Sequence, residues 1–184
     1  MLASASPRRA ELLRAAGITF DVHPAHIDET VRGGEVPEAY VRRMAEEKAR
    51  VVHALQPGRV VLAADTTVVV GSLILGKPAD PGDARRMLGL LSGRSHEVIT
   101  GVTMVAGVDG RMETQVGTTT VEFAALQADD IDWYVASGEP MDKAGAYAIQ
   151  GGASRFITRI DGSYSNVVGL PVALVWEMLK RLTS

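Results

Sequence analysis

Two arginines that directly follow a helix-start signal are the first residues whose chemistry stands out. In the run Ser6-Pro7-Arg8-Arg9, Ser6 is a candidate N-cap and Pro7 suits the first helical position. Cations in a first turn oppose the helix macrodipole, at a cost of about 0.3–1 kcal/mol each at exposed sites. Free helix N–H groups and two guanidinium groups together would form a strong receptor for an anion. The alternative is a pair of solvated arginines that pair with acids such as Glu11.

A lysine falls within the apolar face of a predicted helix. When each residue is advanced by 100° from Val41, Lys48 shares an arc of about 120° with Met44, Val52 and other apolar residues. Because an isolated buried ammonium is costly, this position suggests a helix face that looks into a cleft holding a negatively charged ligand. The alternative is a lysine that reaches past the edge of the apolar stripe to water.

Two carboxylates are candidates for water activation and metal binding. Asp65 follows the apolar run Val60–Ala64, which is typical of a central buried strand. The C-terminal end of such a strand is where open α/β sheets place ligands, so Asp65 could activate water or hold a divalent metal. The alternative is an Asx turn that ends the strand. Glu29 becomes a second candidate metal ligand only if the fold brings it to Asp65.

The segment Gly71–Pro78 nearly matches the phosphate-binding pattern G-x-x-x-x-G-K-[ST]. Pro78 replaces the hydroxyl residue that would hold magnesium, and the apolar loop positions fit a hairpin around Gly71-Ser72 better. We therefore reject a P-loop, although Lys77 can still bind phosphate as a point charge.

A second segment, Asp142–Gly152, is rich in glycine and alanine. Small residues allow a ligand to approach the backbone closely. Gln150 carries both a donor and an acceptor, which suits recognition of the edge of a nucleobase. The alternative is an ordinary ordered loop.

Strand and helix patterns alternate around these residues, without a repeat or a low-complexity linker. Helices are predicted over Pro7–Ala16, Val36–Leu55, Pro81–Leu91, Asp130–Ala136 and Pro171–Leu182. Strands are predicted over Leu2–Ala5, Ile18–Ile27, Val60–Ala64, Thr67–Val70, Leu73–Leu75, His96–Ala106, Arg111–Leu126 and Phe156–Ile160. Trp133 and Trp176 are predicted to pack in the core. This mixture of βα units and antiparallel hairpins predicts an α/β fold with a mixed central sheet flanked by helices.

Composition excludes several classes of protein. The chain has 184 residues, 46% of them hydrophobic and 22% charged, as in ordinary globular domains. It contains no cysteine, which excludes disulfides, a thiol nucleophile and cysteine-ligated metals. The net charge of −3 argues against a nucleic-acid-binding protein. Because the longest apolar runs are far below the roughly 18–20 residues of a membrane span and no signal peptide is evident, we expect a cytoplasmic protein without membrane contact.

Taken in order, the motifs resemble those of the Maf-like nucleoside triphosphate pyrophosphatases. The matching segments are Leu2–Arg9 with Glu11–Leu13, Lys48-Ala49, Ala64–Thr66, Gly76–Pro78, Ser92–Arg94, His96–Val98, Lys143–Gln150 and Gly162–Pro171. They cover nearly the whole chain. The resemblance implies a single Maf-like domain over residues 1–184, elongated, with a cleft between two lobes. Lys143–Gly151 is similar to the branch selective for dTTP and UTP rather than to the branch selective for 7-methyl-GTP.

This resemblance implies an activity and a set of site residues. The activity is hydrolysis of dTTP or UTP between the α- and β-phosphorus, which yields the monophosphate and pyrophosphate and cleans nucleotide pools. Asp65 is the implied proton acceptor, and Glu29 and Asp65 are the implied ligands of one divalent metal, Mg²⁺ or Mn²⁺. The implied substrate-binding residues are Ser6, Arg8, Arg9, Lys48, Thr66, Lys77 and Gln150. The usual assembly of the family implies a homodimer.

Other functions remain open at the level of the sequence. One is a pyrophosphatase for 7-methyl-GTP or other modified nucleotides, and another is a non-enzymatic nucleotide-binding regulator of cell division. A binding protein would use the same cationic side chains, so turnover must distinguish them. Two departures from the family pattern stand out: Ala148 occupies a position where glycine is expected, and the chain begins at the first motif with almost no leading strand.

Overall fold

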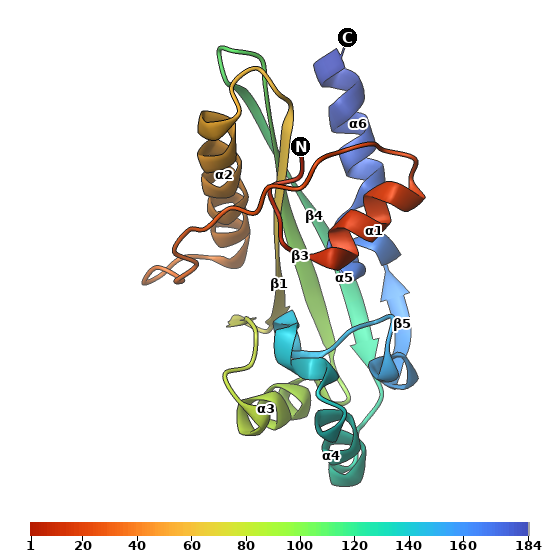
Figure 1. Cartoon of the computed structure of the whole chain (residues 1–184). Coiled ribbons are helices and arrows are strands. Elements are labelled where there is room, and N and C mark those ends of the chain that lie inside the picture. Colours follow the sequence, from red (N-terminus) through yellow and green to blue (C-terminus); the bar gives the residue numbers. More distant parts are fainter. Residues whose placement is uncertain (184) are drawn as a thin grey trace. The chain divides into compact units, whose positions relative to one another are not determined.

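The computed structural model describes residues 1–183, which divide into two compact units (Figure 1). Unit 1 comprises Met1–Thr66, Thr100–Gly117 and the described part of Gly169–Ser184, and unit 2 comprises Thr67–Ile99 and Thr118–Val168. Three long strands contribute residues to both units: β1 (Val61–Val70), β3 (Ser95–Ala106) and β4 (Arg111–Phe123).

These strands belong to a five-stranded sheet of order β2-β1-β3-β4-β5, completed by β2 (Leu73–Leu75) and β5 (Ile157–Asp161). β1 and β2 pair antiparallel with Val70 opposite Leu73, which confirms the predicted hairpin around Gly71-Ser72. β4 and β5 also pair antiparallel. Leu2 supplies the parallel component, since it forms isolated parallel bridges to Val22 and Leu62.

Unit 1 contains three helices that pack on its part of the sheet. They are α1 (Pro7–Ala15), α2 (Pro37–Leu55) and α6 (Val172–Thr183). Ala10 and Leu13 of α1 share one apolar cluster with Val175 and Met178 of α6. A second cluster brings Ala49 and other residues of α2 against β1. The predicted start of α1 at Pro7 is confirmed, and Gly17, at φ +72°, follows this helix, whereas α2 begins at Pro37, one residue after the predicted start.

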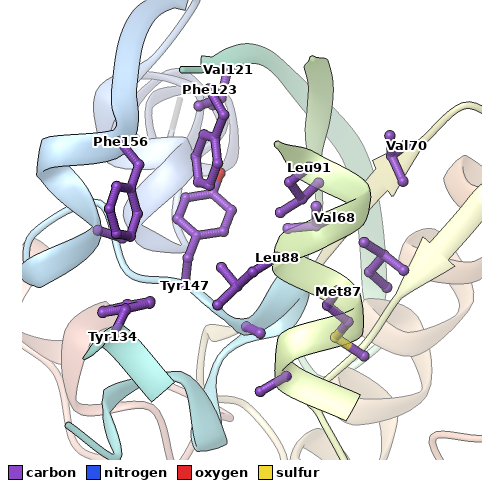
Figure 2. Packing of buried hydrophobic residues seen from close by; sticks show 14 of the residues in the cluster. Val68, Val70, Met87, Leu88, Leu91, Val121, Phe123, Tyr134, Tyr147 and Phe156 are labelled. Carbon is purple, nitrogen blue, oxygen red and sulfur yellow. The ribbon is translucent and has the colours of Figure 1, made fainter. Parts of the chain in front are cut away.

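Unit 2 has its own core and its own helices. These are α3 (Pro81–Leu91), α4 (Ala128–Ala136) and α5 (Tyr164–Val168), together with the 3₁₀ turns η1 (Glu139–Asp142), η2 (Ala144–Ala146) and η3 (Gly152–Phe156). Figure 2 shows the core, in which the rings of Phe123, Tyr134, Tyr147 and Phe156 gather beside the leucines of α3. The long loop that carries Gln150 is thus anchored in a packed core.

The structure corrects several strand predictions. The segments Leu2–Ala5 and Ile18–Ile27 form no strand, and only Leu2 and Val22 make isolated bridges. Val60–Ala64 and Thr67–Val70 are not separate strands but parts of β1, so Asp65 lies within a strand and not at its end. The polar residues 65–67 had suggested a break between two strands. The strand continues through them because threonine fits a strand well and the carboxylate of Asp65 pairs with Lys48 inside the protein.

The two tryptophans are the other correction. Trp133 and Trp176 were expected in the core, but they are 47% and 53% exposed. Their helices are amphipathic, and an apolar neighbourhood in the sequence does not establish which face a ring occupies. The guanidinium of Arg155 lies 4.0 Å from the ring centroid of Trp133 and covers part of its face. Among residues 1–183, no helix is long and apolar enough to cross a membrane.

Candidate active site

A lysine held between two carboxylates forms the centre of the candidate site in unit 1. The Nζ of Lys48 lies 2.6 Å from Oδ1 of Asp65 and 2.7 Å from Oε1 of Glu29. The side chains of Lys48 and Asp65 are each only 10% exposed, whereas that of Glu29 is 51% exposed. The fold therefore does bring Glu29 to Asp65, with a cation between them and an opening to solvent on the side of Glu29.

The packing of α2 explains how Lys48 reaches this position. The buried residues of the helix are Val41, Met44, Ala45, Lys48, Ala49 and Val52, the face that the sequence predicts. Gly101 on β3 makes the close packing possible, since a Cβ there would lie 2.3 Å from the carbonyl oxygen of Val41. Because α2 packs so closely on the sheet, the side chain of Lys48 contacts Asp65 of β1 and does not extend to water.

Tyr40 is a member of the site that the sequence analysis missed. Its hydroxyl donates to the backbone carbonyl of Glu29 at 3.1 Å. Burial raises the pKa of Tyr40, and the charges of Asp65 and Glu29 raise it further. Tyr40 lies eight residues before Lys48, a spacing that places both on one face of α2, and this is the signal that could have identified it.

Arg9 is buried, and it connects three distant segments of unit 1. Its Nε donates to the carbonyl of Gly169 at 2.8 Å, and its Nη1 donates to the carbonyl of Ala64 at 2.8 Å and to Oγ of Ser4 at 3.1 Å. Its Nη2 donates to Oγ1 of Thr66 at 3.0 Å. Burial lowers the pKa of the guanidinium, and the negative charge of Asp65 opposes that effect. With four of its five N–H donors committed, Arg9 holds the residues on either side of Asp65.

Thr66 and the start of α1 surround this arginine. Oγ1 of Thr66 also lies 2.9 Å from Oγ1 of Thr100 and donates to the carbonyl of Gly169 at 3.2 Å. Ser6 is the N-cap of α1 but makes no capping hydrogen bond with its side chain, and the first turn contains no acid. Arg8 in that turn is half-buried, unlike Arg9. The two arginines therefore differ, one being part of the interior and the other reaching solvent.

Lys77 and Gln150 belong to unit 2, and both are exposed. Lys77 follows β2, and the carbonyl of its neighbour Gly76 accepts a hydrogen bond from the backbone N–H of Gly145 at 3.0 Å. The segments that carry Lys77 and Gln150 are thus tied to each other within unit 2.

The carboxylates of Glu29 and Asp65 are the side chains of this site that could hold a divalent cation. No cluster of three or more acidic or histidine side chains that could hold a metal occurs within residues 1–183. The carboxylate oxygens of Glu29 and Asp65 both lie within 2.7 Å of Lys48 Nζ, so the ammonium occupies the position between them. Mg²⁺ in phosphoryl-transfer sites is typically bound by one or two carboxylates together with substrate phosphates and water. The donor set of Glu29 and Asp65 suits that arrangement.

Comparison with known proteins yields one family and a consistent group of relatives. Residues 1–182 match the family described as Maf-like protein. The dTTP/UTP pyrophosphatase of Syntrophus aciditrophicus is 52% identical over 184 residues, which cover 100% of this chain and 90% of that relative. The dTTP/UTP pyrophosphatase of Anaeromyxobacter dehalogenans strain 2CP-C is 55% identical and covers 98% of this chain and 92% of its own length.

A solved structure supports the fold. The HAM1 protein from Coxiella burnetii matches with a TM-score of 0.52 and 18% identity, over 98% of this chain and 97% of that protein. At this identity the likeness concerns the arrangement of helices and strands and not the chemistry of the site.

Proposed function

Since the chain belongs to the Maf-like protein family, we propose that it is a nucleoside triphosphate pyrophosphatase that hydrolyses dTTP and UTP to the monophosphate and pyrophosphate. The observation that carries the chemistry is the buried contact of Lys48 with Asp65, with Glu29 at the solvent side. The choice of substrates rests on relatives that are 50–55% identical and share one name.

Asp65 is the proposed proton acceptor. The oxygen of a water bonds to the α-phosphorus while the bond from that phosphorus to the bridging oxygen breaks, and pyrophosphate leaves with the electron pair. The proton of the water passes to Asp65, whose position is held by Lys48 on one side and by the Arg9 contacts to Ala64 and Thr66 on the other. Positioned bases of this kind typically contribute about 10²–10⁴-fold to the rate.

The cationic side chains are proposed to neutralise the triphosphate, which carries close to four negative charges. Arg8, Lys48 and Lys77 are each assigned to the phosphates, where fixed positive charge stabilises the leaving pyrophosphate. Ser6 and Thr66 are assigned to the same substrate. Arg9 acts mainly by holding the strand and the loop at Gly169, because its donors are committed to protein oxygens.

Glu29 and Asp65 are the proposed ligands of one Mg²⁺ or Mn²⁺. Such an ion, when bound, offsets the charge that develops on the phosphate oxygens. Gln150, exposed in the loop of unit 2, is proposed to read the pyrimidine edge.

A panel of nucleotides tests the proposed function. The purified protein is incubated with dTTP, UTP, dCTP, dGTP, ATP and 7-methyl-GTP, with Mg²⁺, Mn²⁺ or a chelator, and pyrophosphate is detected. We expect dTTP and UTP to be hydrolysed fastest and the chelator to abolish turnover. Preference for 7-methyl-GTP would overturn the assigned substrates, and binding of dTTP without turnover would favour a regulatory nucleotide-binding protein.

A homodimer remains a prediction from the family resemblance, and a cytoplasmic location remains a prediction from the sequence. Light scattering coupled to size-exclusion chromatography measures the mass in solution, and a mass of one chain, 19.6 kDa, would contradict the dimer.

A further inference from the structure

A buried tyrosine reaches the backbone of the loop that carries Gln150. Tyr134 of α4 is fully buried, and its hydroxyl accepts a hydrogen bond from the backbone N–H of Ala148 at 3.0 Å. The same hydroxyl donates to Oε1 of Glu139 at 2.7 Å. One phenol group thus connects the loop to a carboxylate on the neighbouring turn η1.

Glu139 holds the other end of the same segment. Its Oε2 accepts a hydrogen bond from the backbone N–H of Gly152 at 3.0 Å. Gly151 permits this contact, because a Cβ at that position would lie 2.1 Å from Oε1 of Glu139. The backbone carbonyl of Glu139 in turn accepts a hydrogen bond from Nζ of Lys143, at the start of the loop.

Gln150 lies at the middle of the segment that these two residues hold. Ala148 and Gly152 are each two positions from it, and both of their backbone N–H groups bond to the pair Tyr134–Glu139. Ile149 is buried whereas Gln150 is exposed, so the amide is presented at the surface by a segment whose neighbouring residue is anchored in the core.

The hydrogen bonds of Tyr134 and Glu139 hold the backbone of Ala148–Gly152 in a fixed position. Burial raises the pKa of Tyr134, so the phenol stays protonated and donates to Glu139 through the physiological range. Hydrogen bonds to a carboxylate are shorter and stronger than those between neutral groups. Loss of either side chain would leave a backbone N–H of the loop without its acceptor.

We propose that Tyr134 and Glu139 are positioning residues for nucleobase selection, which hold Ala148–Gly152 so that the amide of Gln150 meets the pyrimidine edge. The proposal rests on the proposed function for the identity of the base. Tyr134 and Glu139 then affect which nucleobase is selected, and they do not affect binding of the phosphates.

The variants Tyr134→Phe and Glu139→Gln test this role, since each keeps the shape of the side chain. A small misplacement of a positioning group can cost up to about 100-fold, so we expect kcat/KM for dTTP and UTP to fall roughly 10–100-fold. The loss should appear mainly in KM, and the preference over dCTP and dGTP should shrink. The inhibition constant of tripolyphosphate, which has no base, should stay the same. Tyr164→Phe is the matched control, because Tyr164 is an exposed tyrosine of the same unit.

Equal losses for all four nucleotides, or an unchanged preference in folded Tyr134→Phe and Glu139→Gln proteins, would overturn the proposal. Thermal melting identifies a variant that fails to fold, in which case the other variant decides. If the unaltered protein binds dTTP without hydrolysing it, the proposed function fails, and the ratio of dissociation constants for dTTP and dGTP in the same variants still decides the positioning role.

Discussion

The buried ion pair of Lys48 and Asp65 connects stability to chemistry at the scale of single residues. A buried charge that loses its partner is strongly destabilising, whereas the intact pair adds little. Glu29 lies 2.7 Å from the same ammonium, so Lys48 keeps a carboxylate partner when Asp65 loses its charge, whereas Asp65 loses the cation it pairs with when Lys48 is replaced. The two members of the pair should therefore respond differently to substitution.

Asp65→Asn should lower kcat by about 10²–10⁴-fold while the protein stays folded. The amide keeps the volume of the carboxylate and can accept a hydrogen bond from Lys48, but it cannot take up a proton. Steady-state kinetics with dTTP measures the effect, and circular dichroism confirms folding. A folded Asp65→Asn protein with near-normal turnover would remove Asp65 from the mechanism.

Lys48→Met should lower the free energy of unfolding by about 3 kcal/mol, because it leaves the carboxylate of Asp65 buried without its cation. Urea denaturation at neutral pH measures the change. Lys180→Met is the matched control: Lys180 is half-exposed and pairs with Glu177 on the surface of α6, where an ion pair contributes at most about 1 kcal/mol. A loss in Lys48→Met no larger than in the control would contradict the importance of the buried pair.

Gln150→Ala should reduce kcat/KM for dTTP and UTP without changing the concentration of metal that gives half-maximal activity. A site that depends on a hydrogen bond to its substrate discriminates strongly when that bond is lost. Assays across the nucleotide panel, each with a metal titration, measure both quantities. Rates equal to those of the unaltered protein for every nucleotide would remove Gln150 from base recognition.

At the scale of elements, the close packing of α2 on β3 depends on the absence of a side chain at Gly101. Gly101 has no Cβ, and one placed there would meet the backbone of Val41, which cannot move without moving the helix. Since Lys48 lies on the same face of α2, the distance between helix and sheet also sets the distance between Lys48 and Asp65.

Gly101→Ala should therefore destabilise the protein by about 1–3 kcal/mol, the usual cost of overpacking, and reduce turnover as well. Gly89→Ala is the matched control: Gly89 lies inside α3, a Cβ there would meet nothing within 4 Å, and alanine favours a helix by roughly 0.5–1 kcal/mol. Thermal melting and dTTP turnover of both variants measure the contrast. Equal stability of the two would show that α2 can shift without cost.

How far the sequence predicts the fold depends on whether a signal is local. Proline and glycine mark the ends of α1, and the 100° periodicity correctly assigns Lys48 to the buried face of α2. The partner of Lys48 is not predictable in this way, since periodicity identifies a face but not what covers it. The contact of Arg9 with Gly169, 160 residues away, has no local signal at all. The prediction that Trp176 packs in the core was wrong for the same reason, because its neighbours in sequence are not its neighbours in space.

At the scale of the whole molecule, one buried histidine should make stability depend on pH. His96 is 2% exposed, its Nε2 lies 2.8 Å from the hydroxyl of Tyr147, and burial lowers the pKa of its ring to about 4. The unfolded chain takes up a proton near pH 6.5 and the native protein only near pH 4, so stability falls as pH drops through that window.

The free energy of unfolding should fall by about 2 kcal/mol from this histidine between pH 7.5 and pH 5. Urea denaturation at the two pH values measures the loss, and His96→Gln, which keeps a polar group near the hydroxyl of Tyr147, should remove it. The same pH dependence in His96→Gln as in the unaltered protein would assign the effect to other groups.

The reach of Arg9 also bears on how the protein is made. Its guanidinium bonds to Ala64 and Gly169, at separations of 55 and 160 residues, so most of the polypeptide must leave the ribosome before the arginine has its full set of acceptors. Contacts of such long range form late, since the chain must first close a large loop. A nascent chain that ends before Gly169 would thus leave the strand around Asp65 without this support.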